Sequence, residues 1–494
     1  MLFVVKLFPE ITIKSRPVRR RFIRQLRRNI RSVLSDYDEA VTVTGEWDSL
    51  EVTTTVNDEI TTALVIEKLR NTPGISIILQ VDKHPLGDFD NIFELCKDYY
   101  GERLAGKTFA VRCKRSGRHP FKSIDVEKYV GGGLNQHTEA AGVKLVKPDV
   151  TVQIEIRHEE LFIVKQRFQG LGGFPLGCQD SVLSLISGGF DSSVSSYMTI
   201  KRGLQTHYCF FNLGGNAHEI AVKEVALYLW MKYGNSHRVK FISVPFEAVV
   251  EEILTKVENS QMGVVLKRMM LRAATEVAQG LEIKALVTGE SIAQVSSQTL
   301  PNLAVIDSVT DILVLRPLVT ANKQEIIDVA RVIGTEDFSK NIPEYCGVIS
   351  VKPTTRAKKE RVEREEGNFD FEVLENSIKN ATHQLITHVA KDLDRESAEV
   401  KIIDNIAMFT DSIEQLTIID IRHPSEEERK PLILTEDNSP QLQKIPFYQL
   451  RTSFTDLDQS RTYWLYCDKG MMSRLHVAYL QDEGFANVAV FAPA

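Results

Sequence analysis

The sequence has few cysteines, no long apolar run and no excess of basic residues, and each shortage excludes a class of protein. Six cysteines spread over 494 residues cannot form the disulfide framework of a small secreted protein, so they favour a reducing compartment. No apolar run approaches the ~18 residues that a membrane-spanning helix needs. The formal net charge is −6, so nucleic-acid binding would require local basic patches on an acidic background.

The remaining composition is that of an ordinary globular protein, with 43% hydrophobic and 26% charged residues. This length predicts three or four domains. The apolar start, Met1–Pro9, is interrupted by Lys6 and Pro9 and is typical of a strand rather than a secretory signal. The arginine-rich, acid-poor segment behind it leaves a mitochondrial presequence as a minority alternative.

The stretch Val182–Ser193 organises the rest of the chain. Its apolar first half predicts a buried strand, and Val194, Tyr197 and Met198 then recur at helical spacing. Between them lies the turn Ser187-Gly188-Gly189-Phe190-Asp191-Ser192-Ser193. Glycines let the backbone approach a ligand, and the first N–H groups of the helix favour an anion.

The turn lacks the lysine of a Walker loop, which excludes that mechanism. Its Ser-Gly-Gly-x-Asp-Ser-Ser pattern resembles the pyrophosphate loop of ATP-pyrophosphatases, which adenylate a carbonyl oxygen and release pyrophosphate. A plain Gly-Ser turn between a strand and a helix is the structural alternative.

The N-terminal segment carries a dense basic helix. Val18, Phe22, Leu26 and Ile30 recur every four residues and predict an amphipathic helix from Arg16 to Arg31. Eight arginines share this helix: Arg16, Arg19, Arg20, Arg21, Arg24, Arg27, Arg28 and Arg31. Phosphate contact is the functional interpretation, and a solvated helix face is the alternative. Strands at 42–44 and 50–52 complete a strand, helix, strand, strand pattern that suggests a small ferredoxin-like unit.

A second unit, from about 61 to 167, contains a basic loop. The predicted strand Thr108–Val111 leads into Arg112–Phe121, which is rich in Lys and Arg and broken by Gly117 and Pro120. A helix ending at Gly131–Gly133 and a hairpin of 150–156 with 161–164 follow. This arrangement resembles the THUMP domain of RNA-modifying enzymes. Cys113 has arginines around it, but a lone cysteine at a strand end is more often inert.

The third unit begins after the Gly-rich linker at 170–175. Predicted strands at 182–186, 207–212, 239–245, 285–288 and 313–316 alternate with helices, which favours a doubly wound parallel sheet. Ligands of such sheets bind beyond the carboxyl ends of the strands. The Ser187 loop, Gly289 and Lys323 all follow strands, so we expect them to converge.

The last unit places a thiol before a helix. The predicted strand Thr462–Tyr466 runs into Cys467, and the loop 467–473 opens the helix 474–480. Backbone N–H groups at a helix start stabilise a thiolate or a persulfide. The loop resembles the rhodanese active-site loop, and Asp420-Ile421-Arg422 matches an early motif of that fold. A buried cysteine at a strand end is the alternative.

Taken together, the Ser187 loop, the segment Asn341–Cys346 and the Cys467 loop resemble the tRNA 4-thiouridine synthetases in their long form. The resemblance implies a multidomain α/β chain: a ferredoxin-like domain at 1–60, a THUMP domain at 61–167, an ATP-pyrophosphatase domain at 168–395 and a rhodanese-like domain at 402–494. It implies Asp191 and Lys323 as residues needed for adenylation. The remaining implied ATP contacts are Leu185, Ile186, Ser187, Gly188, Gly189, Asp191, Ser192, Ser193, Lys267, Gly289 and Gln298.

The same resemblance implies ATP with Mg²⁺, tRNA as substrate, a cysteine desulfurase as persulfide donor and a sulfur-carrier protein of thiamine thiazole synthesis. It further implies a cytoplasmic enzyme without membrane contact, with a homodimer as one candidate assembly. Met472 stands where thiosulfate rhodaneses carry a cation, so a protein persulfide is favoured as donor.

In the chemistry that we expect, AMP is transferred to C4–O of uridine, and a persulfide on Cys467 supplies sulfur. Lys267 and Lys323 would stabilise charge on the phosphates. Cys346 would then attack the Cys467 sulfur and form a disulfide; release of free sulfide before attack on the base is the other route. The basic residues Lys352, Arg356, Lys358 and Lys359 fit an RNA contact or a solvated helix face. An adenylating amidotransferase and an RNA-binding sulfur carrier without adenylation activity are the rival functions.

Overall fold

The computed structural model describes residues 1–45, 47–213, 215–340, 342, 352–389, 401–404, 406, 409, 413–422, 427–428, 430–434, 440–467 and 471–493. The chain divides into two compact units, Met1–Pro175 and Leu176–Ala494, and each is described by itself. The predicted site residue Cys346 lies outside the described residues. Among the described residues, no helix combines the length and apolarity that crossing a bilayer requires.

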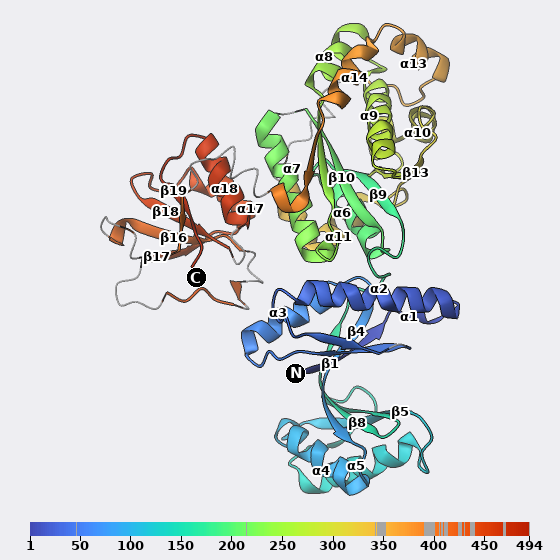
Figure 1. The fold of residues 1–494 in the computed structure, drawn as a ribbon, viewed down its shortest axis with the longest axis vertical. Helices are drawn as coiled ribbons and strands as arrows, with labels where there is room; N and C mark the ends of the chain where they lie inside the picture. Colours follow the sequence, from blue (N-terminus) through green and yellow to red (C-terminus); the bar gives the residue numbers. More distant parts are fainter. Residues whose placement is uncertain are drawn as a thin grey trace. The chain divides into compact units, whose positions relative to one another are not determined.

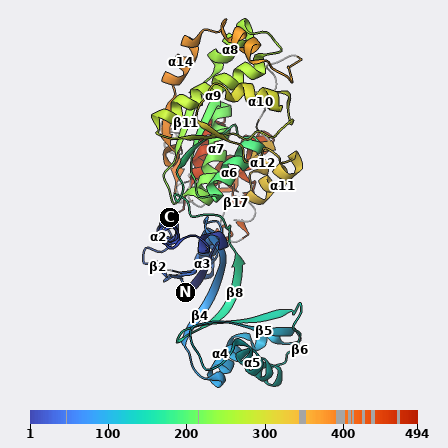
Figure 2. The same ribbon diagram turned by 90° about the vertical axis from the view of Figure 1, so that its right-hand side faces the viewer.

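The described strands of the first unit form one sheet in the order β2-β3-β1-β4-β8-β7-β5-β6. Figure 1 labels four of them, β1, β4, β5 and β8. Its strands are β1 (Leu2–Leu7), β2 (Thr42–Thr44), β3 (Ser49–Thr53), β4 (Ile75–Pro85), β5 (Thr108–Ser116), β6 (Gly142–Val143), β7 (Val150–Arg157) and β8 (Glu160–Gln169). Its helices are α1 (Pro9–Thr12), α2 (Arg16–Leu34), α3 (Glu59–Arg70), α4 (Phe89–Tyr100), the short 3-10 helix η1 (Glu102–Leu104) and α5 (Ser123–His137). Figure 2 shows the long strands β4 and β8 joining the part that carries α2 and α3 to the part that carries α4 and α5.

The expected domain boundary at residue 60 lies in the first turn of α3, and the next strand, β4, pairs with β1 through Ile75–Val81. Two elements of this unit are longer than the sequence predicted. The strand expected to end at Val111 continues to Ser116, because the alternating residues of β5 pair with all of β7. The helix expected to end at Gly131–Gly133 continues to His137. Gly133 lies inside this helix, where its missing side chain lets α5 pack closely against Phe93 of α4: an added Cβ would lie 2.6 Å from Phe93 Cδ2.

The second unit begins with a mixed six-stranded sheet in the order β13-β12-β9-β10-β11-β14. The predicted strands are present as β9 (Ser181–Leu185), β10 (Gln205–Asn212), β11 (Lys240–Pro245), β12 (Ala285–Val287) and β13 (Leu313–Leu315), and they pair in parallel. The edge strand β14 (Thr382–Leu385) runs antiparallel to β11 and was not predicted, because four residues with little alternation give no strand signal.

Helices cover both faces of this sheet (Figure 1). Leu183 of β9 points into the cluster formed with α8 (Glu247–Lys256), α9 (Met262–Gly280) and α10 (Leu300–Asp307). Ser184, its neighbour, points to the other face, where its hydroxyl hydrogen-bonds Ser196 of α6 (Phe190–Lys201) at 2.8 Å. The remaining helices of this part are α7 (Gly215–Leu229), η2 (Trp230–Gly234), the 3-10 helix η3 (Ser296–Gln298), α11 (Lys323–Ile333), α12 (Glu336–Lys340), α13 (Lys359–Glu366) and α14 (Phe371–Lys379).

In the C-terminal part of the second unit, the described residues form a parallel sheet of five strands in the order β15-β19-β18-β16-β17. Its strands are β15 (Ile402–Ile403), β16 (Leu416–Asp420), β17 (Gln441–Lys444), β18 (Thr462–Tyr466) and β19 (Val488–Phe491). Its helical elements are η5 (Ile413–Gln415), α17 (Phe447–Phe454) and α18 (Met471–Asp482). The Asp420-Ile421-Arg422 motif makes a buried ion pair, in which Arg422 Nε lies 2.9 Å from Asp420 Oδ1. This pair lies at the end of β16, beside the end of the central strand β18, where Cys467 follows.

Candidate functional site

The predicted loop lies between the end of β9 and the start of α6, as its sequence indicated. Gly189 precedes the helix in extended conformation. The Ser192 hydroxyl accepts the N–H of Ser187 at 3.1 Å and donates to the Gly189 carbonyl at 3.1 Å, which closes the turn on itself. The first N–H groups of α6 have no partners within the helix, so the closed turn presents an anion-binding helix start.

Two glycines hold this loop in place for different reasons. Gly188 has φ +80°, in the left-handed region, and a Cβ there would lie 2.5 Å from Ile342 Cδ1. Gly289 follows β12, and a Cβ there would lie 2.6 Å from the carbonyl carbon of Asp191. Gly289 therefore lets the adjacent chain pack directly against the first turn of α6.

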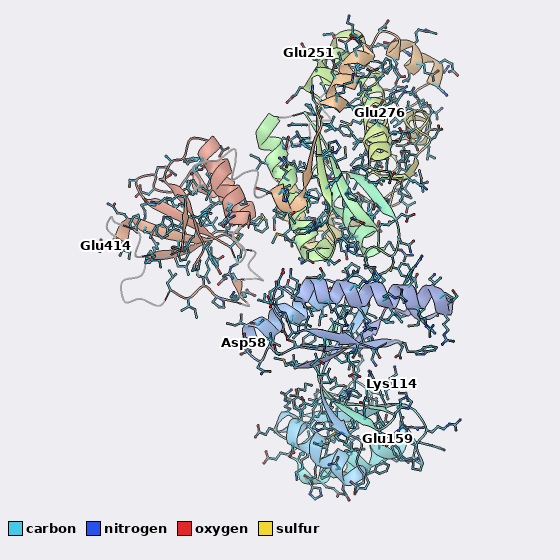
Figure 3. The ribbon with its side chains drawn as sticks, in the orientation of Figure 1. Asp58, Lys114, Glu159, Glu251, Glu276 and Glu414 are labelled. Atoms are coloured by element: carbon cyan, nitrogen blue, oxygen red, sulfur yellow. The ribbon has the colours of Figure 1, made fainter. Side chains whose placement is uncertain are left out.

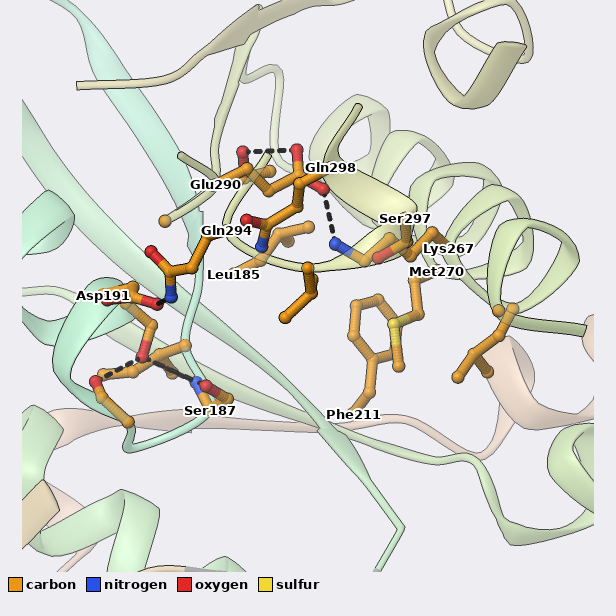
Figure 4. Close-up of a pocket in the computed structure, with 18 of the residues that line it drawn as sticks. Leu185, Ser187, Asp191, Phe211, Lys267, Met270, Glu290, Gln294, Ser297 and Gln298 are labelled. Atoms are coloured by element: carbon orange, nitrogen blue, oxygen red, sulfur yellow. Dashed lines mark hydrogen bonds and ion pairs between the residues drawn. The ribbon is translucent and has the colours of Figure 1, made fainter. Parts of the chain in front are cut away.

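Asp191 is held from both sides. Lys323 Nζ, at the start of α11, lies 2.9 Å from Asp191 Oδ1. Gln294 Nε2 donates to Asp191 Oδ2 at 2.7 Å (Figure 4). The Lys323 side chain is 41% exposed, so its ammonium stays accessible to a ligand. The sequence analysis gave Asp191 and Lys323 the same role, in adenylation. Gln294 was missed because it lies in an irregular segment.

A second cluster of charged side chains consists of Lys267 of α9, Glu290 and Arg316. Lys267 Nζ lies 2.7 Å from Glu290 Oε1, and Arg316 Nε lies 2.8 Å from Glu290 Oε2. Burial alone would raise the pKa of Glu290, but the attraction of Lys267 and Arg316 outweighs it and lowers that pKa to about 2. Glu290 and Arg316 were not predicted as site residues, although Arg316 directly follows β13 and Glu290 lies three residues after the end of β12.

Asp191, Lys267 and Glu290 line one pocket (Figure 4). Its volume is about 470 Å³. Nine predicted ATP contacts line it: Leu185, Ile186, Ser187, Gly189, Asp191, Ser192, Lys267, Gly289 and Gln298. Phe211, Met270 and Ile306 add an apolar wall. The amide oxygen of Gln298 is buried and has no hydrogen-bond partner among the described residues, so it is available to a polar group of a ligand.

Three predicted residues, Gly188, Ser193 and Lys323, are not among the residues that line this pocket. Gly188 accepts a hydrogen bond from Ser339 of α12 at 3.0 Å. Ser193 is fully buried and donates to the Phe190 carbonyl at 3.0 Å, so it shapes the helix start. Lys323 reaches the site through Asp191.

Cys467 ends β18, and α18 begins at Met471. The thiol is buried, with its sulfur accepting the N–H of Ser473 at 3.3 Å and lying 3.4 Å from the Ser473 hydroxyl. A sulfur facing the first turn of a helix is placed as a thiolate or a persulfide requires. Cys113 differs: burial, with Glu127 nearby, raises its pKa to about 11, which agrees with the inert interpretation.

The arginines of α2 divide into two groups. Three of them are bound to the protein: Arg19 stacks 3.9 Å from the centre of the Trp47 ring, and Arg27 and Arg31 donate to the Val43 carbonyl at 3.3 and 2.9 Å. The others are exposed: Arg16, Arg20, Arg21, Arg24 and Arg28. Within the described ranges, Arg16, Arg20, Arg24 and Arg28 have no side-chain hydrogen bond or ion pair, and their spacing of four residues aligns them as a row. We call these four the arginine row.

The predicted basic loop is partly folded into β5. Arg112 donates to the Leu145 carbonyl at 2.6 Å, and Arg115 lies 2.8 Å from His119 Nδ1. Lys114, labelled in Figure 3, is exposed on β5, as are Arg118 and Lys122 after it. Lys352, Arg356, Lys358 and Lys359 are exposed in the second unit, which leaves both interpretations of that stretch open.

Comparisons with known proteins match all of these parts. Family models match the "ThiI ferredoxin-like domain" over residues 2–78, the "THUMP domain" over 87–164 and "Thiamine biosynthesis protein (ThiI)" over 177–371. The chain is 56% identical over 493 residues to a tRNA sulfurtransferase of Pseudomonas putida, and 56% identical over 494 residues to that of Azotobacter vinelandii, with 100% of each chain covered. A solved 4-thiouridine synthetase–RNA complex with bound ATP is 26% identical, with a TM-score of 0.69, over 78% of this chain and 99% of that chain. The predicted ferredoxin-like, THUMP and ATP-pyrophosphatase architecture is thereby confirmed.

Proposed function

This chain belongs to the tRNA sulfurtransferase family, and we propose that it is an ATP-dependent enzyme that replaces the C4 oxygen of a tRNA uridine with sulfur. The observation that carries the proposal is the position of the Asp191 carboxylate. Lys323 and Gln294 hold it beyond the carboxyl end of β9, beside a pocket large enough for a nucleotide. Full-length identity of 56% to tRNA sulfurtransferases supports the same reaction.

The nucleotide half of the reaction makes the uridine oxygen a good leaving group. The apolar wall and the unpartnered Gln298 oxygen suit a base, and the start of α6 suits the phosphates. When the uridine oxygen attacks the α-phosphate, negative charge grows on the departing pyrophosphate. Lys267 and Lys323 are the cations placed to stabilise it.

Mg²⁺ fits this site only when it is bound together with the nucleotide phosphates. Within the described part of the chain, no three Asp, Glu, His or Cys side chains gather as a cage. Mg²⁺ in phosphoryl-transfer sites usually keeps several waters and takes one or two carboxylates, and Asp191 is the accessible carboxylate here. Bound there with ATP, the ion would supply charge neutralisation on the phosphates.

The sulfur half of the reaction uses the C-terminal, rhodanese-like part. A persulfide on Cys467 attacks the activated carbon, AMP leaves, and Cys467 is joined to the base through a disulfide. The Cys346 thiolate then attacks the Cys467 sulfur, which releases 4-thiouridine and leaves a Cys346–Cys467 disulfide for an external dithiol to reduce. Support comes from the Ser473 N–H at the Cys467 sulfur.

The remaining partners follow from the same chemistry. A cysteine desulfurase in the cytoplasm is the persulfide donor that we propose, and the sulfur-carrier protein of thiazole synthesis is a second acceptor. The arginine row and the exposed bases Lys114, Arg118 and Lys122 are the surfaces that we assign to the tRNA backbone. We also propose that two copies of this chain form a homodimer.

Asp191→Ala tests the assignment because it removes the carboxylate without touching the thiol. We expect tRNA thiolation by the purified variant to be abolished, while Cys467 still accepts ³⁵S from a desulfurase. Normal thiolation by this variant would refute the adenylation site. Loss of both activities would show a folding defect, which circular dichroism of the variant identifies.

A further inference from the structure

The lining of the pocket contains a carboxylate, which a site for an anionic ligand should avoid. Glu290 lines the pocket, and only 10% of its side chain is exposed. Both of its oxygens are used: Oε1 binds Lys267, and Oε2 accepts from Arg316 and from the Thr288 hydroxyl, at 3.1 Å. A buried negative charge beside a triphosphate is unfavourable unless it serves another group.

Arg316 fixes this carboxylate in place. Besides Glu290, Arg316 binds both oxygens of Asp307, at 2.8 and 2.5 Å, and a paired guanidinium of this kind holds one orientation. Asp307 ends α10 and Arg316 directly follows β13, so two elements of the fold set the position of Glu290. Glu290 therefore cannot follow Lys267 if the lysine moves toward a ligand.

Lys267 is the member of this cluster that still has hydrogen-bond donors to offer a ligand. Its ammonium has three N–H donors and sits on a flexible chain, whereas the described contacts give it one partner, Glu290. One donor can stay on Glu290 while another reaches a phosphate of the nucleotide. An unrestrained lysine would first have to lose its rotamer freedom, which opposes binding.

We infer that Glu290, fixed by Arg316 and Asp307, is a positioning residue that holds the Lys267 ammonium inside the pocket, where it can meet a phosphate of the nucleotide. The inference rests on the proposed function, because it needs a nucleotide in this pocket. It assigns Glu290 no contact with the substrate. Its effect on nucleotide binding must therefore pass through Lys267.

A double-mutant cycle on ATP binding tests this dependence. With Lys267 present, Glu290→Gln should weaken ATP binding about tenfold, which corresponds to a coupling of roughly 1.4 kcal/mol between side chains in contact. With Lys267→Ala, the same change should leave ATP binding unchanged or make it tighter, because a negative charge is lost near the phosphates. Arg331→Gln removes an exposed ion pair with Glu336 and serves as the matched control.

Equal weakening in both backgrounds, or no weakening when Lys267 is present, would overturn the inference. If Glu290→Gln does not fold, Arg316→Lys replaces it in the same cycle, since lysine keeps the charge but cannot bridge Glu290 and Asp307 with a fork. Failure of the proposed function is recognised separately: the parent enzyme would then show no tRNA-dependent ATP–pyrophosphate exchange.

Discussion

Replacing Gly289 by alanine displaces Asp191 without changing any charge. The added Cβ would lie 2.6 Å from the Asp191 carbonyl carbon, 2.7 Å from its oxygen and 2.8 Å from the Ser192 nitrogen. Ordinary contact between carbon atoms begins at about 3.5 Å, so the first turn of α6 must move by roughly 0.9 Å. All three atoms belong to the backbone, and a rotamer change cannot relieve the overlap.

Such a movement has two calculable effects. Overpacking of this kind costs about 1–3 kcal/mol of stability. A displacement near 1 Å in a catalytic group lowers the rate by roughly 100-fold. The hydrogen bonds of Asp191 to Lys323 and Gln294, at 2.9 and 2.7 Å, should lengthen at the same time.

The assay is tRNA-dependent ATP–pyrophosphate exchange, with urea unfolding to measure stability. Gly280→Ala is the control, because nothing lies within 4 Å of a Cβ added there, at the last residue of α9. Sulfur acceptance by Cys467 should be unchanged in both variants. A Gly289→Ala enzyme that exchanges pyrophosphate at the parent rate would refute the close-packing argument.

Three other predictions follow from the same structure. Neutralising Arg20, Arg24 and Arg28 to glutamine should reduce the salt slope of tRNA binding by about three, one for each phosphate contact; an unchanged slope, measured by filter binding at several salt concentrations, would mean that the row is only solvated. The pKa of Glu290 is depressed to about 2, so its stabilisation is present above its ordinary pKa of 4.5 and is lost as the pH falls toward 2. The parent should thus be about 3 kcal/mol more stable than Glu290→Gln at pH 7, with the difference shrinking in acid-unfolding measurements below pH 4.5; a constant difference would contradict the assignment. A single turnover without reductant should leave Cys346 and Cys467 in one disulfide-linked peptide, and product formed with both thiols free would rule this out.

The sequence alone determined the local part of the site. A strand, a Gly-rich turn and a helix start are encoded within a few residues, so the loop from Ser187 to Ser193 could be located by periodicity and glycine placement. The same holds for Cys467, which a strand places directly before a helix. Each of these features depends on neighbours in the chain, and that is the range over which residue patterns carry information.

Only the tertiary structure decided which distant side chains meet. Lys267 lies on α9, and Glu290 and Arg316 lie in the segments that follow β12 and β13. Their ion pairs form because β12 and β13 are neighbouring parallel strands and α9 packs against the face of their sheet. Gln294 reaches Asp191 across 103 residues of sequence, from a segment without periodicity. The arginines of α2 look alike in the sequence, and the Val43 carbonyl and the Trp47 ring separate those bound to the protein from those left in solvent. Long-range contacts of this kind depend on the packing of whole elements, which no local pattern of residues specifies.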